Sequence, residues 1–307
     1  LGANTTGTRN TAVGSEAADA INTGQDNTAI GSLALSADTK GNYSTAIGRA
    51  ALKTQNFTSS TSAHNTAVGY GAGEAVTTGA NNTLIGSLAG DAITTGAANV
   101  AVGYRSLSAT TTASSNTAIG VDALTSNTTG TSNTAVGRDT LNQQTTASYN
   151  TALGHQALNL NTSGANNTAS GYRALYANTT GTRNVAVGTT SLDANTTAND
   201  NTALGYDAMS SNTTGQMNVA VGTYAFDANT TGDFNVAVGR VALSTNTTAD
   251  FNTALGYAAL EVNTTGTQNT AVGAGALDSN TTGENLVAVG YNSLSANTTA
   301  DDNVAIG

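Results

Sequence analysis

The chain has 307 residues, of which 9% are charged, and it carries a net charge of −10 without any cysteine or proline. The acidic balance argues against nucleic acids and anionic membranes as partners, because both repel a negative surface. The absence of cysteine excludes disulfides and thiolate metal sites, and no apolar run within this segment approaches the ~20 residues that a membrane span needs.

A five-residue motif of the form Asn-Thr-Ala-Val-Gly recurs along the whole chain. The interval between its glycines is 17 residues, except for one interval of 21. A strict internal repeat of this length is typical of a solenoid. We therefore expect residues 1–307 to form a single continuous repeat domain, cut from a longer chain, with a four-residue insertion between Gly48 and Gly69. The eighteen motifs end at Gly14, Gly31, Gly48, Gly69, Gly86, Gly103, Gly120, Gly137, Gly154, Gly171, Gly188, Gly205, Gly222, Gly239, Gly256, Gly273, Gly290 and Gly307.

The repeat that contains residues 116–132 illustrates the expected local structure. Residues 117–119 alternate β-branched side chains with an alanine, a pattern typical of a short strand. A second short strand is predicted at Ala123 and Leu124, and turns are predicted at Gly120 and Gly130. No apolar stripe has the 3.6-residue period of a helix. The predicted fold class is all-β, a parallel β-solenoid or β-roll of 17-residue coils.

Each coil offers only about two large apolar side chains, which is little to offset the ordering entropy of its backbone. The nearly constant alanine of the motif suggests that another backbone approaches closely at that position. We therefore expect a homo-oligomer of parallel chains in register. The residues predicted to form the core are Leu124, Val136, Val187, Leu192, Val221 and Leu243.

Asparagine recurs at two fixed places in each repeat. In stacked coils, each side-chain amide can bond to the equivalent amide of the next coil and form a ladder. The alternative is glycosylation, since Asn127, Asn178 and Asn212 lie in Asn-Thr-Thr sequons. The ladder is favoured because the asparagines follow the repeat. The predicted ladder residues are Asn116, Asn127, Asn133, Asn178, Asn184, Asn212 and Asn218.

The repeats, and most specifically the Val-Ala-Val-Gly segments 185–188 and 219–222, resemble the head repeats of trimeric autotransporter adhesins. They are also similar to 17-residue repeats of phage-tail-fibre-like and bacterial surface-fibre proteins. The resemblance covers the whole chain, although the adhesin heads have a shorter repeat. It implies a left-handed β-roll, a homotrimer, and an extracellular fibre segment: the stalk or head of a cell-surface or tail-fibre-like appendage. The implied role is structural or adhesive, toward a host-cell, prey-cell or glycan surface.

The sequence shows no constellation of enzyme chemistry. Neither His64 nor His155 has a second histidine at metal-ligand spacing, and no Ser-His-Asp set is discernible. We therefore expect no catalytic residue, no cofactor and no metal site. Aspartates such as Asp193, Asp207 and Asp227 are interpreted as a solvated face, with weak cation sites as the alternative. Exposed aromatic residues either grip sugars or pack at a turn or subunit seam. The possible contact residues are Tyr104, Tyr172, Tyr206, Tyr257, Tyr291, Phe57 and His64.

Two other function classes compete with a fibre. A ligand-binding solenoid surface, such as an ice-binding face, is the alternative because stacked threonines can form flat arrays. Adjacent residues such as Thr128 and Thr129 would, however, point to opposite faces. A polysaccharide-processing β-helix would need paired carboxylates in a groove, and none can be identified.

Overall fold

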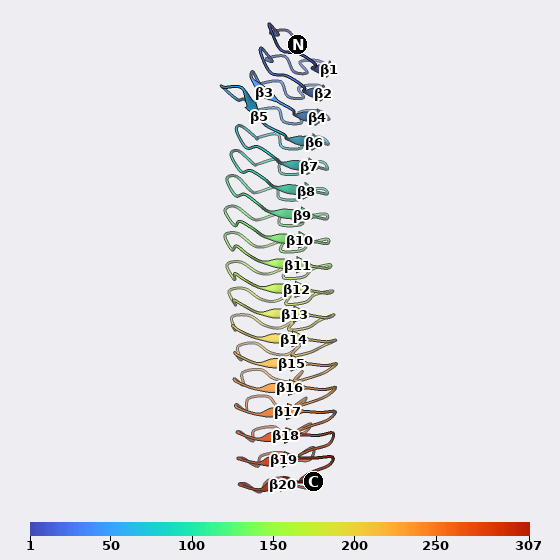
Figure 1. Ribbon diagram of the computed structural model, residues 1–307, viewed down its shortest axis with the longest axis vertical. Coiled ribbons are helices and arrows are strands. Elements are labelled where there is room, and N and C mark those ends of the chain that lie inside the picture. The colour runs from blue at the N-terminus through green and yellow to red at the C-terminus, as the bar shows by residue number, and fades with distance from the viewer. The chain divides into compact units, whose positions relative to one another are not determined.

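The computed structural model describes all 307 residues and contains strands and turns but no helix. The chain divides into two compact units, Leu1–Asn150 (unit 1) and Thr151–Gly307 (unit 2). In each unit the chain winds into stacked coils, and a short strand recurs at the same place in every coil (Figure 1). The predicted fold class, an all-β parallel solenoid with 17-residue coils, is confirmed.

The strands of unit 1 pair in parallel and in register. Equivalent repeat positions face each other, as in the pairing of Thr11 with Thr28 and of Val13 with Ile30. Two further strands, β3 (Gly41–Asn42) and β5 (Thr61–Ser62), pair only with each other. The strands of the main sheet in unit 1 are β1 (Thr11–Val13), β2 (Thr28–Ile30), β4 (Thr45–Ile47), β6 (Thr66–Val68), β7 (Thr83–Ile85), β8 (Val100–Val102), β9 (Thr117–Ile119) and β10 (Thr134–Val136).

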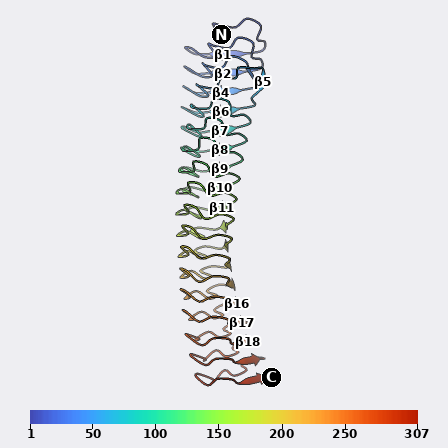
Figure 2. The same cartoon turned by 90° about the vertical axis from the view of Figure 1, so that its left-hand side faces the viewer.

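Unit 2 repeats the same arrangement without interruption. Its strands follow one another at 17-residue intervals and again pair in parallel, for example Val219 with Val236. Figure 2 shows the successive coils of this unit from the side. They are β11 (Thr151–Leu153), β12 (Thr168–Ser170), β13 (Val185–Val187), β14 (Thr202–Leu204), β15 (Val219–Val221), β16 (Val236–Val238), β17 (Thr253–Leu255), β18 (Thr270–Val272), β19 (Val287–Val289) and β20 (Val304–Ile306).

The second strand predicted in each repeat does not form. In its place the chain makes successive turns, with left-handed backbone at Asp122 (φ 55°) and Leu124 (φ 51°). The amide of Leu124 nevertheless donates to the carbonyl of Thr140 in the next coil at 3.0 Å. Hydrogen bonding between coils therefore continues through the turns, and the apolar pair Ala123-Leu124 marks a buried bend.

The strand faces the opposite way from the prediction, which placed the valines in the core and the alanine toward a neighbouring chain. Ala118 is fully buried inside the coil, whereas Ile119 is 39% exposed. Leu124, Leu192 and Leu243 are fully buried, but the valines placed in the core with them are only half-buried. Their side chains lie on the outward face of the strand, because successive strand residues point to opposite sides. These valines are Val136, Val187 and Val221.

One coil shows why the inward strand residue is otherwise alanine. β7 carries Leu84 at that position, and the leucine that follows the strand elsewhere is replaced by Gly73 and Gly90. A Cβ atom on Gly73 would lie 2.7 Å from Leu84 Cδ1, and one on Gly90 would lie 2.8 Å from Leu84 Cδ2. The interior of a coil therefore accommodates one large side chain at this level, contributed either by the strand or by the turn.

The motif glycine is required where coils stack most closely. Gly120 has φ +136°, and a Cβ atom there would lie 2.4 Å from the carbonyl oxygen of Gly137 in the next coil. An L-residue would be strained by the backbone conformation and would also collide with the neighbouring coil. This close approach repeats at the motifs that are followed by another coil of the same unit, and it explains why the glycine follows the 17-residue period.

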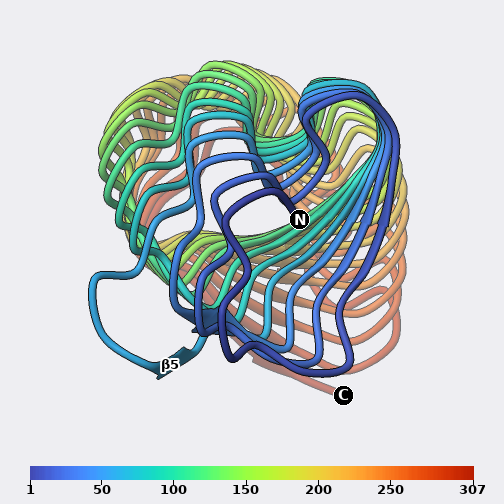
Figure 3. The same cartoon turned by 90° about the horizontal axis from the view of Figure 1, so that it is seen from above.

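The insertion in unit 1 leaves the stack without changing its register. Figure 3 shows the segment carrying β5 outside the outline of the neighbouring coils. Asp38 holds its base, since Oδ1 accepts the amides of Gly41 at 3.0 Å and Phe57 at 3.2 Å. Gln55 Nε2 donates to Asp38 Oδ2 at 2.7 Å. Strand pairing then resumes in register, with Thr45 opposite Thr66.

Candidate interaction surfaces

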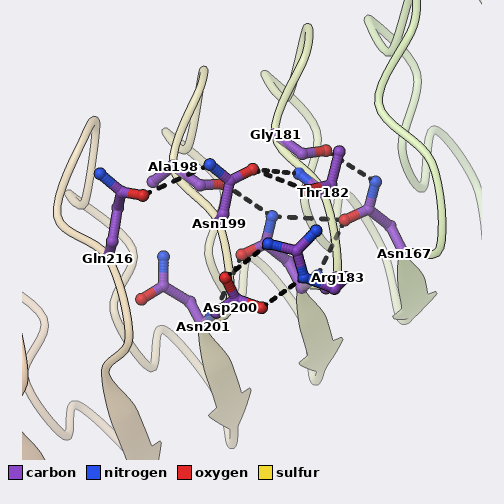
Figure 4. Close-up of polar contacts among 10 residues, drawn as sticks. Asn167, Gly181, Thr182, Arg183, Ala198, Asn199, Asp200, Asn201 and Gln216 are labelled. Atoms are coloured by element: carbon purple, nitrogen blue, oxygen red, sulfur yellow. Dashed lines mark hydrogen bonds and ion pairs between the residues drawn. The ribbon is translucent and has the colours of Figure 1, made fainter.

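A column of asparagines just before the strands, interrupted only by Ser44 and Leu286, ties successive coils together. Asn167 Oδ1 accepts the backbone amide of Asn184 at 2.9 Å, and Asn167 Nδ2 donates to the carbonyl of Gly181 at 2.8 Å (Figure 4). Asn184 repeats this arrangement with Asn201 and Ala198. Each buried amide thus substitutes for a peptide group between two coils, where an unpaired polar group would be costly.

A second asparagine column lies in the Asn-Thr-Thr turns. Asn178 Nδ2 donates to Asn161 Oδ1 at 2.9 Å, and the amide of Asn212 reaches Asn195 Oδ1 at 3.1 Å. The structure places all the predicted ladder residues in these two columns, and each of them is buried: Asn116, Asn127, Asn133, Asn178, Asn184, Asn212 and Asn218. A glycan on the sequon asparagines Asn127, Asn178 or Asn212 would have no space in the folded coil.

The outer face of each unit is formed by the first and third residues of the strands. No strand contains a charged residue, so this face is composed of threonine and branched apolar side chains, with Ser170 of β12 as the exception. Its apolar members are substantially exposed, and the most exposed in unit 2 include Leu153, Leu204 and Leu255. Because the strands pair in register, the same side chains recur at the ~4.8 Å spacing of a sheet.

A leading column borders the outer face, formed by the residue just before each strand-preceding asparagine. The guanidinium of Arg183 binds Asp200 through two bonds, Nε to Oδ1 at 2.6 Å and Nη2 to Oδ2 at 2.8 Å (Figure 4). These contacts lower the pKa of Asp200 below its ordinary value. Phe234 and Phe251 stack at 5.0 Å in the same column. Equivalent side chains in adjacent coils thus pair along the stack.

The two predicted contact residues near the insertion differ in exposure. His64 is exposed in the leading column, where its ring stacks on Tyr43 with centroids 5.0 Å apart. Phe57 is only 6% exposed and packs at the base of the insertion, so it cannot serve as a contact residue on the free surface. The sequence showed an aromatic residue in an insertion but not the inward bend that buries it.

A trailing column follows the strands, formed by the residue directly after each motif glycine. All five tyrosines named as possible contacts lie in it and are exposed: Tyr104, Tyr172, Tyr206, Tyr257 and Tyr291. Tyr70 belongs to the same column and was not named from the sequence, although it directly follows the motif glycine Gly69. Arginines occur here too, with Arg49 Cζ 5.6 Å from the Tyr70 ring centroid and Arg240 Cζ 5.9 Å from that of Tyr257.

The aspartates on the turns are half-buried and do not form the solvated face expected from the sequence. Asp193 Oδ1 and Asp227 Oδ1 have no hydrogen-bond partner. Burial raises the pKa of both carboxyl groups, and the charge of Asp207 raises both further. Arg173 Nη2 lies 3.3 Å from Asp193 Oδ2 and partly opposes the rise at that residue. No group of three or more His, Cys, Asp or Glu side chains is placed to hold a metal ion.

The comparisons with known proteins add no relative. A scan against protein-family models finds no match, and a search of curated proteins finds none either. The structure has no helix that is long and apolar enough to cross a membrane, and its surface shows no pocket. The surfaces described above are therefore the basis for a functional proposal.

Proposed function

We propose that this segment is a non-catalytic structural or adhesive fibre element outside the cell, the stalk or head of a surface or tail-fibre-like appendage. The observation that carries this proposal is the outer face: an uncharged strip of threonine and branched apolar residues, repeated in register in every coil. A contiguous strip of exposed apolar side chains is a mark of an interaction site.

A second copy of the same chain is the partner that fits this face best. Contact along many successive coils requires a partner with the same repeat distance along the stack. Another copy of the repeat has that distance by construction, and parallel copies place equivalent coils at the same level. The resemblance of the Val-Ala-Val-Gly segments to trimeric autotransporter adhesin heads favours three chains. In such an assembly the outer faces would be covered and the trailing columns would lie at their borders.

Carboxylates placed on the outer face test this assembly. The variant V187D/V238D introduces two charges at half-buried positions of β13 and β16. We expect it to lower the native mass from three chains to one, because burying an unpaired charge in an interface is costly. The control T197D/T248D adds the same charges at exposed threonines of the turns and should retain the assembled mass. An unchanged mass of V187D/V238D would contradict the proposal.

Ice binding is the second candidate, and the face that would serve it differs from the one considered in the sequence. Thr117 and Ile119 both project outward from β9, and their equivalents form regular ranks on the outer face. A thermal hysteresis assay separates the two functions. Hysteresis from a single-chain particle would favour ice binding, whereas an assembled particle without hysteresis would favour the fibre.

A further inference from the structure

The trailing column contains an ordered pattern that the fibre proposal does not require. Three times along the chain, four successive coils present a basic residue or histidine, a tyrosine, a small residue and a second tyrosine. One example lies in unit 1 and two lie in unit 2. The three sets are Arg49, Tyr70, Ser87 and Tyr104; His155, Tyr172, Thr189 and Tyr206; and Arg240, Tyr257, Ala274 and Tyr291.

The arginines of this pattern differ from the others in the chain. Five of the seven arginines have a carboxylate within ion-pair distance: Arg9, Arg105, Arg138, Arg173 and Arg183. Arg49 and Arg240 do not, and each lies instead over the tyrosine ring of the next coil. Both guanidinium groups are exposed. In a chain with a net charge of −10, these two cations, one in each unit and both at the same repeat position, are available for an external anion.

The tyrosines supply a second element of recognition. Tyr70 is 51% exposed and Tyr257 is 57% exposed, so each ring presents apolar surface together with a hydroxyl group. The next residue in the column is Ser87 or Ala274, which is too small to cover the ring from the following coil. The second tyrosine stands two coils away, which corresponds to about 10 Å at the ~4.8 Å strand spacing.

We propose that these sets bind a saccharide chain that carries carboxylate groups. Sugar rings would stack their C–H faces on the two tyrosines, and the arginine would bind a carboxylate through its paired N–H groups. A linear polysaccharide suits a row of rings at fixed spacing, since it also presents flat faces and charges at regular intervals. The proposal rests on the adhesive part of the proposed function and names its ligand class. Its two arginine sets carry it, and the histidine set is a related copy.

Several copies of the set on one particle offset the weak affinity of each solvent-exposed set. A single exposed arginine–tyrosine pair on a flat surface binds weakly, because solvent competes for both groups. Several sets on one particle can engage one polymer at once, so that the second contact is effectively intramolecular. Binding is therefore expected to strengthen with the length of the saccharide.

The test uses the full chain in its native assembly and two probes, oligogalacturonate and its methyl ester, which differ only in the carboxylate charge. We expect the wild-type protein to bind the acid form about tenfold more tightly than the ester, as charge-assisted bonds suggest. The variant R49Q/R240Q should lose that tenfold preference and bind both probes like the ester. The variant Y70A/Y257A should weaken the binding of both probes.

The control R9Q/Y149A removes an arginine and an exposed tyrosine of the leading column and should bind like the wild type. Lack of binding to the acid form, equal affinity for the two probes, or an equal loss in the control would overturn the proposal. The native mass of each variant is measured in parallel. An assembled particle that ignores the acid form contradicts this inference alone, whereas a single-chain particle contradicts the fibre proposal.

Discussion

At the residue scale, the structure depends on asparagine side chains that act as peptide groups. The amide of Asn184 donates to the carbonyl of Ala198 at 2.8 Å and accepts the backbone amide of Asn201 at 3.0 Å. Because the group is fully buried, no water can replace a lost partner. Only a side chain with both a donor and an acceptor at this length satisfies both neighbours, which explains the recurrence of asparagine and not of aspartate.

The substitution N184D tests this requirement. It retains the size of the side chain but removes the donor and directs a carboxylate at the Ala198 carbonyl. We expect the free energy of unfolding at pH 7 to fall by about 3 kcal/mol, with partial recovery near pH 3 where the acid can donate again. The measurement is chemical denaturation at both pH values.

The matched control is N199D, because the oxygen of Asn199 accepts the amide and the hydroxyl of Thr182, and its Nδ2 donates only to the half-buried side chain of Gln216 at 3.3 Å. That side chain can rotate to donate to a carboxylate instead. Asp233 already fills the equivalent position two coils away and accepts the amide of Gln216. A change of less than about 1 kcal/mol is expected for this control. If N199D were as destabilising as N184D, the special role of the buried column would be refuted.

Removing the carboxylate of Asp227 is expected to stabilise the fold at pH 7, in contrast to the loss of stability expected for N184D. Burial raises the pKa of its carboxyl group, so the folded chain binds that proton more tightly than the unfolded chain does. The resulting stabilisation is present below the unfolded pKa of about 3.9 and is lost as the pH rises through the folded value. D227N should therefore raise the thermal midpoint at pH 7 and have little effect at pH 3.

The control for this prediction is D200N, because Arg183 lowers the pKa of Asp200. Its contribution to stability is present above the unfolded pKa and lost as the pH falls through the folded value. D200N should lower the midpoint at pH 7, and only slightly, since the pair is exposed to solvent. Equal signs for the two variants at pH 7 would count against this account of the aspartates.

At the element scale, the coil is determined by which side chain fills its interior. Most coils combine an inward alanine of the strand with a leucine of the turn, whereas Leu84 is combined with Gly73 and Gly90. In the first arrangement the large side chain comes from the turn, and in the second it comes from the strand. The backbone hydrogen bonds are the same in both. Interiors packed to crystal density tolerate such an exchange better than a net change in volume.

A double-mutant cycle of L84A and G90A measures this exchange. L84A alone should cost about 3 kcal/mol through the cavity that it leaves. G90A alone should be destabilising because its Cβ would lie 2.8 Å from Leu84 Cδ2. In the L84A background the contact with Leu84 is gone, while the 2.8 Å contact with Ile93 Cδ1 remains, so G90A should cost at least about 1 kcal/mol less. Additive effects in urea unfolding would show that Leu84 and Gly90 do not share this space.

The elements also show what the sequence can and cannot predict. The strand at residues 117–119 and the ladder through Asn184 followed from the repeat, because a strict period requires equivalent positions to stack. The bend at Leu124 was predicted as a strand, since a left-handed leucine leaves no local sequence signature. The outward orientation of Val187 was missed because alternation identifies two faces without stating which one is inside.

The candidate surfaces were predictable only in part. Five tyrosines of the trailing column were named from their position after the motif glycine. Arg49 and Arg240 could not be grouped with these tyrosines from the sequence. Their distinguishing feature is the lack of a carboxylate neighbour, and ion pairs such as Arg9–Asp26 and Arg183–Asp200 form between residues of different coils. Phe57 was named for its chemistry, but its burial follows from the contacts of Asp38 with the base of the insertion.

At the scale of the whole molecule, the central claim is that copies of this chain cover the outer faces of their coils. Most coils bury one large side chain with alanine and asparagine, and, apart from Leu84, their branched strand residues lie on the outer face. Association with other copies would remove those residues from water, which contributes about 25 cal/mol for each Å² of apolar surface buried. The assembled state should therefore be the stable state at low protein concentration.

The measurement that tests this claim most directly is the native mass of the particle, by native mass spectrometry or by light scattering after size exclusion. We predict a mass of three times the 30.2 kDa chain, maintained on dilution. A mass of one chain would contradict it. The coil would then be stable with its outer face open to water, and the ice-binding assay would become the next experiment.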